Sequence, residues 1–171
     1  MIKLPKEINQ IMKALESKQF KVYAVGGCVR DSLLGMSPLD WDIATNARLD
    51  DLTKIFPSAQ VLNEKCSIIR MDFTVGDGDQ EGIIADIATF RKKGDESDPG
   101  NAGEVVFADT IEEDLGRRDF TINAMADNPS GSIVDPYDGR ADLKAKLIRT
   151  IGDPSEQFSK YPIHMLKAVR L

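Results

Sequence analysis

The chain has 171 residues, of which 42% are hydrophobic and 29% are charged. This composition is ordinary for a globular protein, and the length suits one domain or slightly more. The net charge of −6 argues against a strong nucleic-acid-binding surface on this chain alone, because non-specific affinity comes from Lys and Arg that neutralise phosphates.

The cysteines and the hydropathy pattern exclude two further classes. Cys28 and Cys66 form no C-x-x-C motif, and the chain has a single His, so we expect no zinc site. The N-terminus has no apolar signal region, and no stretch approaches 18 apolar residues. We therefore expect a reduced, cytoplasmic protein without a membrane partner.

The first third of the chain alternates predicted helices and strands. Apolar residues recur at helical spacing over residues 6–18, which predicts an amphipathic packing helix. The β-branched and aromatic run at 22–25 predicts a buried strand that ends at Gly26 and Gly27. Residues 28–34 predict a short helix closed by Gly35.

The glycine turn and the acidic residues after it predict phosphate and metal binding. A strand, a glycine turn and a helix start present backbone N–H groups to one phosphate. Asp40 and Asp42 follow, two apart and hence on one face of a strand. Carboxylates next to bound phosphates are what Mg²⁺-assisted nucleotidyl transfer needs.

Each of these two motifs also has a simpler interpretation. A lone Gly-Gly is usually only a turn, and a lone D-x-D is usually a surface feature. Their occurrence together, at this spacing, favours the functional interpretation. A Rossmann dinucleotide site is excluded, because G-G-C-V-R-D does not fit G-x-G-x-x-G.

The middle of the chain predicts a helix over 49–56 and strands at 61–62, 68–75 and 83–90, with a turn at 76–82 and a flexible loop at 91–103. Asp86 is the one charge in the most apolar of these strands. A buried carboxylate is costly unless it is paired or metal-bound. Two alternatives stay open: an ion pair with a nearby Arg, or a third carboxylate beside Asp40 and Asp42.

Polar residues cluster again at 117–123. Arg117 and Arg118 have the geometry to bind triphosphate oxygens bidentately. Asp119 and Asn123 are four apart, so on a helix they would share one face and hold a ribose hydroxyl. The alternative is a simple hydrogen bond between them on a solvated helix.

The last segment predicts a turn at 135–139, a helix at 140–146 and a short strand at 148–150. A helix then starts at Ser155, its expected N-cap, and continues to Leu171. Because the sequence stops inside this helix, we expect a truncated chain.

The motifs together resemble those of a known family. GG-x-VRD-x-LLG, D-x-D-x-A-T, RRDFTxNAM and DPYDGRADL resemble the signatures of the tRNA nucleotidyltransferase/poly(A) polymerase family, in its bacterial-type (class II) branch. The resemblance implies an α/β (α+β) fold with a mixed sheet flanked by helices, like the polymerase-β nucleotidyltransferase head. It also implies a catalytic head at 1–150 and the start of a helical neck at 151–171.

The resemblance assigns roles to the candidate residues. It implies that Asp40, Asp42 and Asp86 hold two Mg²⁺ ions. Further residues would bind the nucleotide, namely Gly26, Gly27, Arg30 and Arg118 at the phosphates and Asp119 and Asn123 at the sugar. The implied reaction transfers nucleotides from ATP and CTP to the 3′ end of tRNA or another RNA and releases pyrophosphate.

One segment departs from the family. The family has E-D-x-x-R, which pairs with the base of the incoming nucleotide, where this chain has Lys160 to His164. Loss of that charged pair predicts altered base choice. Tyr161 and His164 are candidate base contacts, although His164 also suits a packing or surface position. Three functions therefore stay open: CCA addition, poly(A) or A-only addition, and a non-catalytic nucleotide- or RNA-binding remnant.

Overall fold

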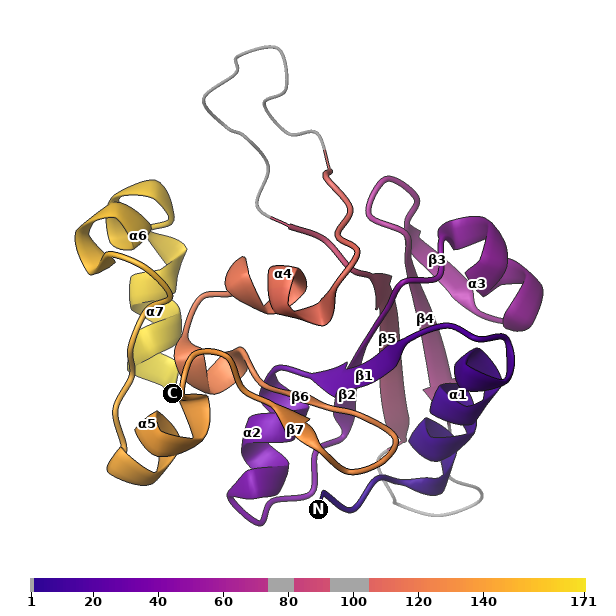
Figure 1. The fold of residues 1–171 in the computed structure, drawn as a ribbon, viewed down its shortest axis with the longest axis horizontal. Coiled ribbons are helices and arrows are strands. Elements are labelled where there is room, and N and C mark those ends of the chain that lie inside the picture. The colour runs from indigo at the N-terminus through magenta and orange to yellow at the C-terminus, as the bar shows by residue number, and fades with distance from the viewer. Residues whose placement is uncertain (1, 74–81, 93–104) are drawn as a thin grey trace.

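The computed structural model describes residues 2–73, 82–92 and 105–171. Within these residues the strands form one sheet in the order β3-β4-β5-β2-β1-β6-β7 (Figure 1). The β2–β5 pair is parallel, and the other neighbours are antiparallel. The strands are β1 Val22–Val25, β2 Asp40–Thr45, β3 Gln60–Asn63, β4 Ile68–Phe73, β5 Ile83–Thr89, β6 Ala126–Asp127 and β7 Ile133–Val134.

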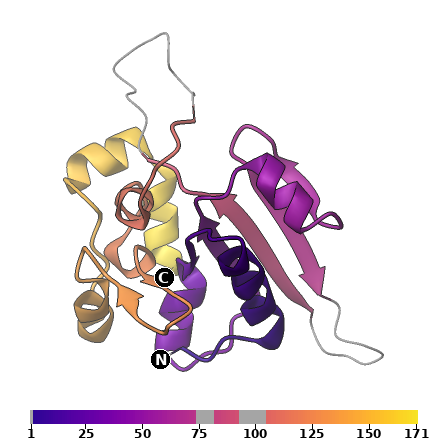
Figure 2. The ribbon, with the colours of Figure 1, turned by 45° about the vertical axis from the view of Figure 1, so that its right-hand side comes forward.

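Helices flank this sheet on both sides, so the expected mixed fold is confirmed. α1 and α3 lie on one side of the molecule, and α5, α6 and α7 gather on the other (Figures 1 and 2). The helices are α1 Lys6–Ser17, α2 Gly27–Leu33, α3 Leu49–Ile55, α4 Ile111–Gly116, the 3-10 turn η1 Thr121–Asn123, α5 Gly139–Ala145, α6 Pro154–Lys160 and α7 Ile163–Arg170.

The two faces of the sheet differ because side chains alternate along each strand. On one face, Trp41 and Ile43 of β2 and Ile87 of β5 pack in a core with the apolar stripe of α1. Burying one such large apolar side chain contributes about 1.5–3 kcal/mol. The opposite face carries a smaller core around Ala44 and Leu115 of α4, and the acidic residues of β2 and β5 emerge beside it.

Most of the predicted elements are confirmed. The helices expected at 6–18, 28–34, 49–56 and 140–146 match α1, α2, α3 and α5 to within one or two residues. The strands expected at 22–25, 61–62, 68–75 and 83–90 correspond to β1, β3, β4 and β5. The predicted turn at 76–82 and loop at 91–103 lie almost wholly outside the described residues.

The C-terminal prediction was wrong in its details. The expected single helix is two helices, α6 and α7, because Pro162 lacks the N–H that would continue the first one. Tyr161 before it adopts φ −128° and ψ 74°, outside the helical region. The N-cap is Asp153, which accepts a hydrogen bond from the Glu156 N–H at 3.0 Å, and Ser155 lies inside the helix.

Two other local predictions also needed correction. The strand expected at 148–150 is reduced to one bridge between Thr150 and Phe120. The hairpin of β6 and β7 had no counterpart among the predicted strands, since each of its strands is only two residues long. Such short strands are fixed by their neighbours in the sheet rather than by their own sequence.

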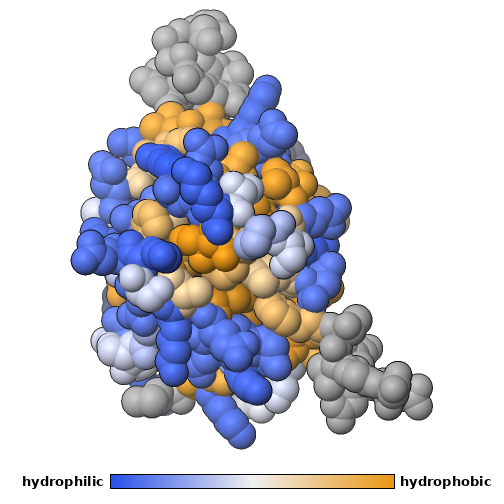
Figure 3. All heavy atoms as spheres, turned by 90° about the vertical axis from the view of Figure 1, so that its right-hand side faces the viewer, coloured by the Kyte–Doolittle hydropathy of each residue, from blue (hydrophilic) through white to orange (hydrophobic). Residues whose placement is uncertain are grey.

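One face of the molecule shows how polar and apolar residues are distributed on the surface. The face bearing α3 and the edge strand β3 is mainly hydrophilic, with smaller hydrophobic areas between (Figure 3). Among the described helices, none combines the length and the apolar character that a membrane crossing requires.

Candidate active site

Three carboxylates stand on one face of the sheet. Asp40 and Asp42 flank the buried Trp41 on β2, so they point away from the main core. β5 runs parallel to β2 with Asp86 directly opposite Asp42. The structure therefore brings residues from two distant parts of the sequence to neighbouring positions.

Asp86 forms an ion pair with an arginine, which is one of the two interpretations that the sequence left open. Arg70 is opposite Asp86 on β4. Its Nε and Nη2 donate to the two carboxylate oxygens at 2.7 and 2.8 Å. These bonds raise the pKa of Arg70. The two hydrogen bonds join Asp86 to the neighbouring strand, and a role of Asp86 in metal binding remains a prediction.

Electrostatics favour a cation beside Asp42. Burial raises the pKa of Asp42, Arg118 opposes this shift, and the like charges of Asp86 and Asp40 add to it. A bound cation would relieve that repulsion, and carboxylate oxygens are the ligands that Mg²⁺ takes. Within residues 2–73, 82–92 and 105–171, no three His, Cys, Asp or Glu side chains are close enough to form a ready metal cage. The carboxylate oxygens of Asp40, Asp42 and Asp86 have the donor chemistry that suits Mg²⁺.

The glycine turn lies next to these carboxylates. Gly26 has φ +78°, in the left-handed region that L-residues rarely adopt. A Cβ at Gly26 would lie 2.8 Å from Nη1 of Arg118 and 3.4 Å from Oδ2 of Asp42. Glycine is therefore required here for both backbone geometry and space, and α2 begins at the next residue.

A chain of polar contacts links the glycine turn to the segment after α4. Arg30 Nη1 donates to Asn123 Oδ1 at 2.6 Å, and Asn123 Nδ2 donates to Asp119 Oδ1 at 3.0 Å. Lys167 of α7 donates to the other oxygen of Asp119 at 3.2 Å. Burial by itself would raise the pKa of Asp119. The hydrogen bonds from Asn123 and Phe120, together with the nearby Lys167, outweigh burial, so the pKa of Asp119 is lowered.

The structure corrects the helix that was expected to carry Asp119 and Asn123. α4 ends at Gly116, and Phe120 is extended with φ −125° and ψ 152°. Asn123 closes the short 3-10 turn that follows. The two side chains still meet, but through this turn, because the Phe120–Thr150 bridge pulls the chain out of helical geometry.

A cavity of about 300 Å³ opens beside the glycine turn. It is lined by Gly26, Gly27, Arg30, Asp42, Arg118, Asp119, Asn123, Lys167, Arg170 and Leu171. A second hollow of about 240 Å³ adjoins it and contains Asp86, Arg91, Asp114 and Arg117 in its lining. Asp42 and Arg118 line both hollows.

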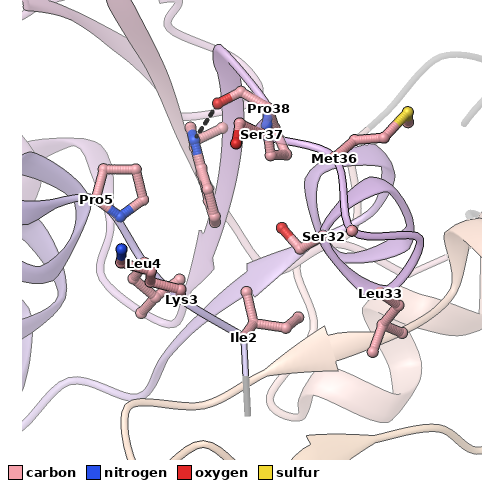
Figure 4. Close-up of a pocket in the computed structure, with 11 residues that line it drawn as sticks. Ile2, Lys3, Leu4, Pro5, Ser32, Leu33, Met36, Ser37 and Pro38 are labelled. Carbon is pink, nitrogen blue, oxygen red and sulfur yellow. Dashed lines mark hydrogen bonds between the residues drawn. The ribbon is translucent and has the colours of Figure 1, made fainter.

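A larger hollow is not a candidate for the chemistry. It measures about 620 Å³ and lies between the N-terminal segment and the loop after α2 (Figure 4). Its only titratable lining residue is Lys3. The indole N–H of Trp41 donates to the Pro38 carbonyl at 3.0 Å in its wall, which fixes the start of β2 rather than a ligand.

The two candidate base contacts, Tyr161 and His164, are not among the residues that line the cavity beside the glycine turn. Tyr161 and His164 stack with their ring centres 5.2 Å apart, and His164 also packs against Phe120 at 6.1 Å. Burial lowers the pKa of His164. From the same helix, Lys167 and Arg170 line the cavity instead. A base-contacting role for Tyr161 or His164 stays a prediction.

Sequence reasoning missed three residues that shape the site. Asp114 binds both Arg117 and Arg118, Arg70 binds Asp86, and Lys167 binds Asp119. Asp114 could have been found, because an acid three and four residues before two arginines indicates helical ion pairs. The other two pairs join distant segments and leave no local signal.

Comparison with known proteins agrees with this geometry. A model of the poly(A) polymerase head domain matches residues 22–149. The chain belongs to this family. The CCA-adding enzyme of Geobacillus thermodenitrificans is 38% identical over 160 residues, which are 94% of this chain and 38% of that enzyme. Poly(A) polymerase I of Haemophilus influenzae is 35% identical over 170 residues, covering 94% of this chain and 36% of the enzyme.

Solved structures of family members share the fold. The CCA-adding enzyme of Bacillus stearothermophilus in complex with CTP superposes with a TM-score of 0.80 at 34% identity, over 96% of this chain and 38% of that one. The Thermotoga maritima CCA-adding enzyme complexed with tRNA gives 0.71 at 31% identity, over 98% and 38% of the two chains. This chain thus spans less than half the length of these relatives.

Proposed function

We propose that this chain is the catalytic head of a nucleotidyltransferase that adds nucleotides from NTPs to the 3′ end of tRNA or a related RNA. The observation that carries the proposal is the cavity in which the glycine turn, Asp42, Arg118 and the Asp119–Asn123 pair meet. The family membership and the CTP and tRNA complexes of its relatives support the same assignment. In this proposal residues 1–150 form the head and 151–171 begin the neck.

Nucleotide binding would use side chains already ordered by their neighbours. Arg30, fixed by Asp31 and Asn123, and Arg118 would pair with oxygens of the triphosphate. Asp119 would accept a hydrogen bond from a ribose hydroxyl, since Asn123 and Lys167 already hold its carboxylate in place. Such preorganisation lowers the entropy lost when the nucleotide binds.

The carboxylates would hold Mg²⁺ together with the nucleotide phosphates. We assign Asp40 and Asp42 to two Mg²⁺ ions, with Asp86 supporting the site from β5. When bound, Mg²⁺ neutralises charge on the transferring phosphate and favours loss of the proton from the attacking hydroxyl. The acceptor 3′ end would approach along the hollow on the Asp86 side of Asp42, opposite the nucleotide. Pyrophosphate would leave on the Gly26 side.

A-only or poly(A) addition is the second candidate. The chain is similar to a poly(A) polymerase over 94% of its length, and residues 160–164 lack the family's acid-and-arginine pair for the base. Two cationic residues of α7, Lys167 and Arg170, line the cavity. Lys167 is bonded to Asp119, the proposed ribose contact. Neither cation by itself selects cytosine over adenine.

The proposal is tested by calorimetric binding of each NTP with and without Mg²⁺. We expect Mg²⁺-dependent binding that is lost in Asp40→Ala/Asp42→Ala. The matched control Glu16→Ala/Asp50→Ala removes two exposed acids from α1 and α3 and should bind as the unmodified chain does. If ATP and CTP bind most tightly of the four NTPs, CCA addition is favoured. If ATP alone binds most tightly, A addition is favoured. Absence of binding to every NTP would contradict the proposed nucleotide site.

A transfer assay completes the test. tRNA with and without its terminal CC is incubated with each labelled NTP, and extension is followed on a gel. Extension of tRNA lacking CC by CTP supports the first candidate. Extension by ATP alone, whatever the 3′ end, supports the second. NTP binding without extension of any RNA would contradict the proposed reaction.

A further inference from the structure

Asp114 is the most enclosed carboxylate near the candidate site. It lies on α4 with 1% of its surface exposed. A charged group in such a position is costly unless several donors surround it. Burial alone raises the pKa of Asp114, but Arg118 and Arg117 outweigh burial, so the pKa is lowered and the group stays charged.

Four donors converge on this carboxylate. Arg117 donates to Oδ1 through Nε and Nη2 at 3.0 and 2.9 Å, and the backbone N–H of Arg91 reaches the same oxygen at 3.0 Å. Arg118 donates to Oδ2 through Nη2 at 3.1 Å. The two arginines are therefore held very differently, one by two bonds and the other by one.

The single bond leaves the rest of the Arg118 guanidinium directed at the glycine turn. Its Nη1 lies 2.8 Å from the place where a Cβ on Gly26 would be. Arg118 Nε is buried and has no hydrogen-bond partner in the part of the chain that the structure describes. A guanidinium offers five N–H donors in a rigid plane, so fixing one corner fixes the direction of the others.

A competing carboxylate lies within reach. Asp42 also borders Gly26, with Oδ2 3.4 Å from the same Cβ position, and its charge interacts with Arg118. Without Asp114, Arg118 would be drawn toward Asp42 and the neighbouring Asp86. There it would neutralise the charges proposed to hold Mg²⁺ and would turn away from the phosphates.

We propose that Asp114 is a positioning residue that holds Arg118 over the glycine turn, where its guanidinium binds the oligophosphate of an incoming nucleoside triphosphate. The inference rests on the proposed function for the identity of the ligand. The two adjacent arginines then have different roles. Arg118 binds the ligand, whereas Arg117 is held by two hydrogen bonds to Asp114.

The test is a double-mutant cycle with inorganic tripolyphosphate as the probe, at constant Mg²⁺. Calorimetry measures its affinity for the unmodified protein, Asp114→Asn, Arg118→Gln and the double variant. We expect each single variant to lose about tenfold in affinity. The double variant should bind no more weakly than Arg118→Gln alone, because Asp114 acts only through Arg118.

Asp142→Asn is the matched control. Asp142 is also buried and holds an arginine, Arg149, at 3.0 and 3.1 Å, but it lies on α5 away from the cavity. It should lose stability without losing tripolyphosphate affinity. If Asp114→Asn does not fold, the cycle is repeated with Asp114→Glu, which keeps the charge but displaces Arg118 and should again lose affinity only when Arg118 is present.

Three results would overturn the inference: no tripolyphosphate binding by the unmodified protein, unchanged affinity in Asp114→Asn, or additive losses in the double variant. The transfer assay distinguishes this failure from failure of the proposed function. Coupled losses without nucleotidyl transfer to RNA would refute the reaction and leave the positioning role. Transfer with additive losses would refute the positioning role alone.

Discussion

The two faces of the central strands are built from alternate residues of the same segments, but one face is apolar and buried and the other carries charged residues. On β2, Trp41 and Ile43 are each 1% exposed and belong to the main core, whereas Asp40 and Asp42 face the other way. On β5, Ile87 belongs to that core and its neighbour Asp86 pairs with Arg70. One face thus supplies stability and the other gathers charge.

Charged side chains on one face of a sheet are tolerated where the other face buries enough apolar area. Burial raises the pKa of Asp42, and the like charges of Asp86 and Asp40 add to this shift. Keeping Asp42 charged is therefore a cost that the apolar face offsets. Substitutions on the two faces should therefore separate stability from chemistry, even between adjacent residues.

The largest expected effect comes from Asp42→Ala. We expect nucleotidyl transfer to fall by at least about 10⁴-fold, equivalent to about 5 kcal/mol of barrier, because a proposed Mg²⁺ ligand is lost. The free energy of unfolding should not fall, since the side chain faces away from the core. Single-turnover transfer and urea denaturation measure the two quantities. Retained transfer would remove Asp42 from the metal assignment.

Ile43→Ala, one residue further on, should show the opposite behaviour. Removing this 1% exposed side chain should lower the free energy of unfolding by about 2–5 kcal/mol through lost burial and a cavity. Tripolyphosphate affinity should stay within about twofold at a temperature where the variant is folded. An Ile43→Ala variant as stable as the unmodified protein would break the distinction between the faces.

Gly26→Ala tests the contact between the glycine turn and the charged face. Its backbone has φ +78° and ψ −135°, a combination that essentially only glycine adopts, and its Cβ would displace Arg118. We expect NTP affinity to fall about tenfold by calorimetry.

Gly35→Ala is the matched control for this substitution. Gly35 has φ +80°, and a Cβ there would meet nothing within 4 Å. The variant should lose some stability, because its φ is also positive, and it should keep NTP affinity. Equal affinity losses in the two variants would show that backbone strain, rather than displacement of Arg118, is responsible.

The smallest effect is expected away from both faces, at Asp142. Hydrogen bonds from Arg149, with a further one from Thr121, lower the pKa of Asp142. A lowered folded pKa contributes stability above the ordinary Asp pKa of about 3.9, and this is lost as the pH falls through the folded value. The buried bond from Thr121, at 2.6 Å, is worth about 1 kcal/mol.

Asp142→Asn should therefore lower the thermal midpoint at pH 7, and the difference from the unmodified protein should shrink below about pH 4. Thermal unfolding across pH 2.5–7 measures it, and NTP affinity should not change. A difference that is independent of pH would show that the charge of Asp142 makes no contribution.

Local pattern predicted much of the fold and part of the site. Helical spacing located α1, apolar runs located β1 and β5, and the Gly26–Gly27 turn was visible as two glycines between a strand and a helix. The break at Pro162 was missed because the flanking apolar positions keep helical spacing across it. The β6–β7 hairpin was missed because two-residue strands carry almost no pattern.

The sequence by itself determined which side chains share a strand face, since residues two apart in a strand point the same way. This placed Asp40 with Asp42 on one face of β2 and Trp41, the residue between them, on the other face. Only the tertiary structure decided that β2 and β5 pair in parallel with Asp42 beside Asp86, and that Asp114 holds Arg118 against Gly26. Pairing between distant segments depends on how the whole core packs, and no local preference of the chain encodes it.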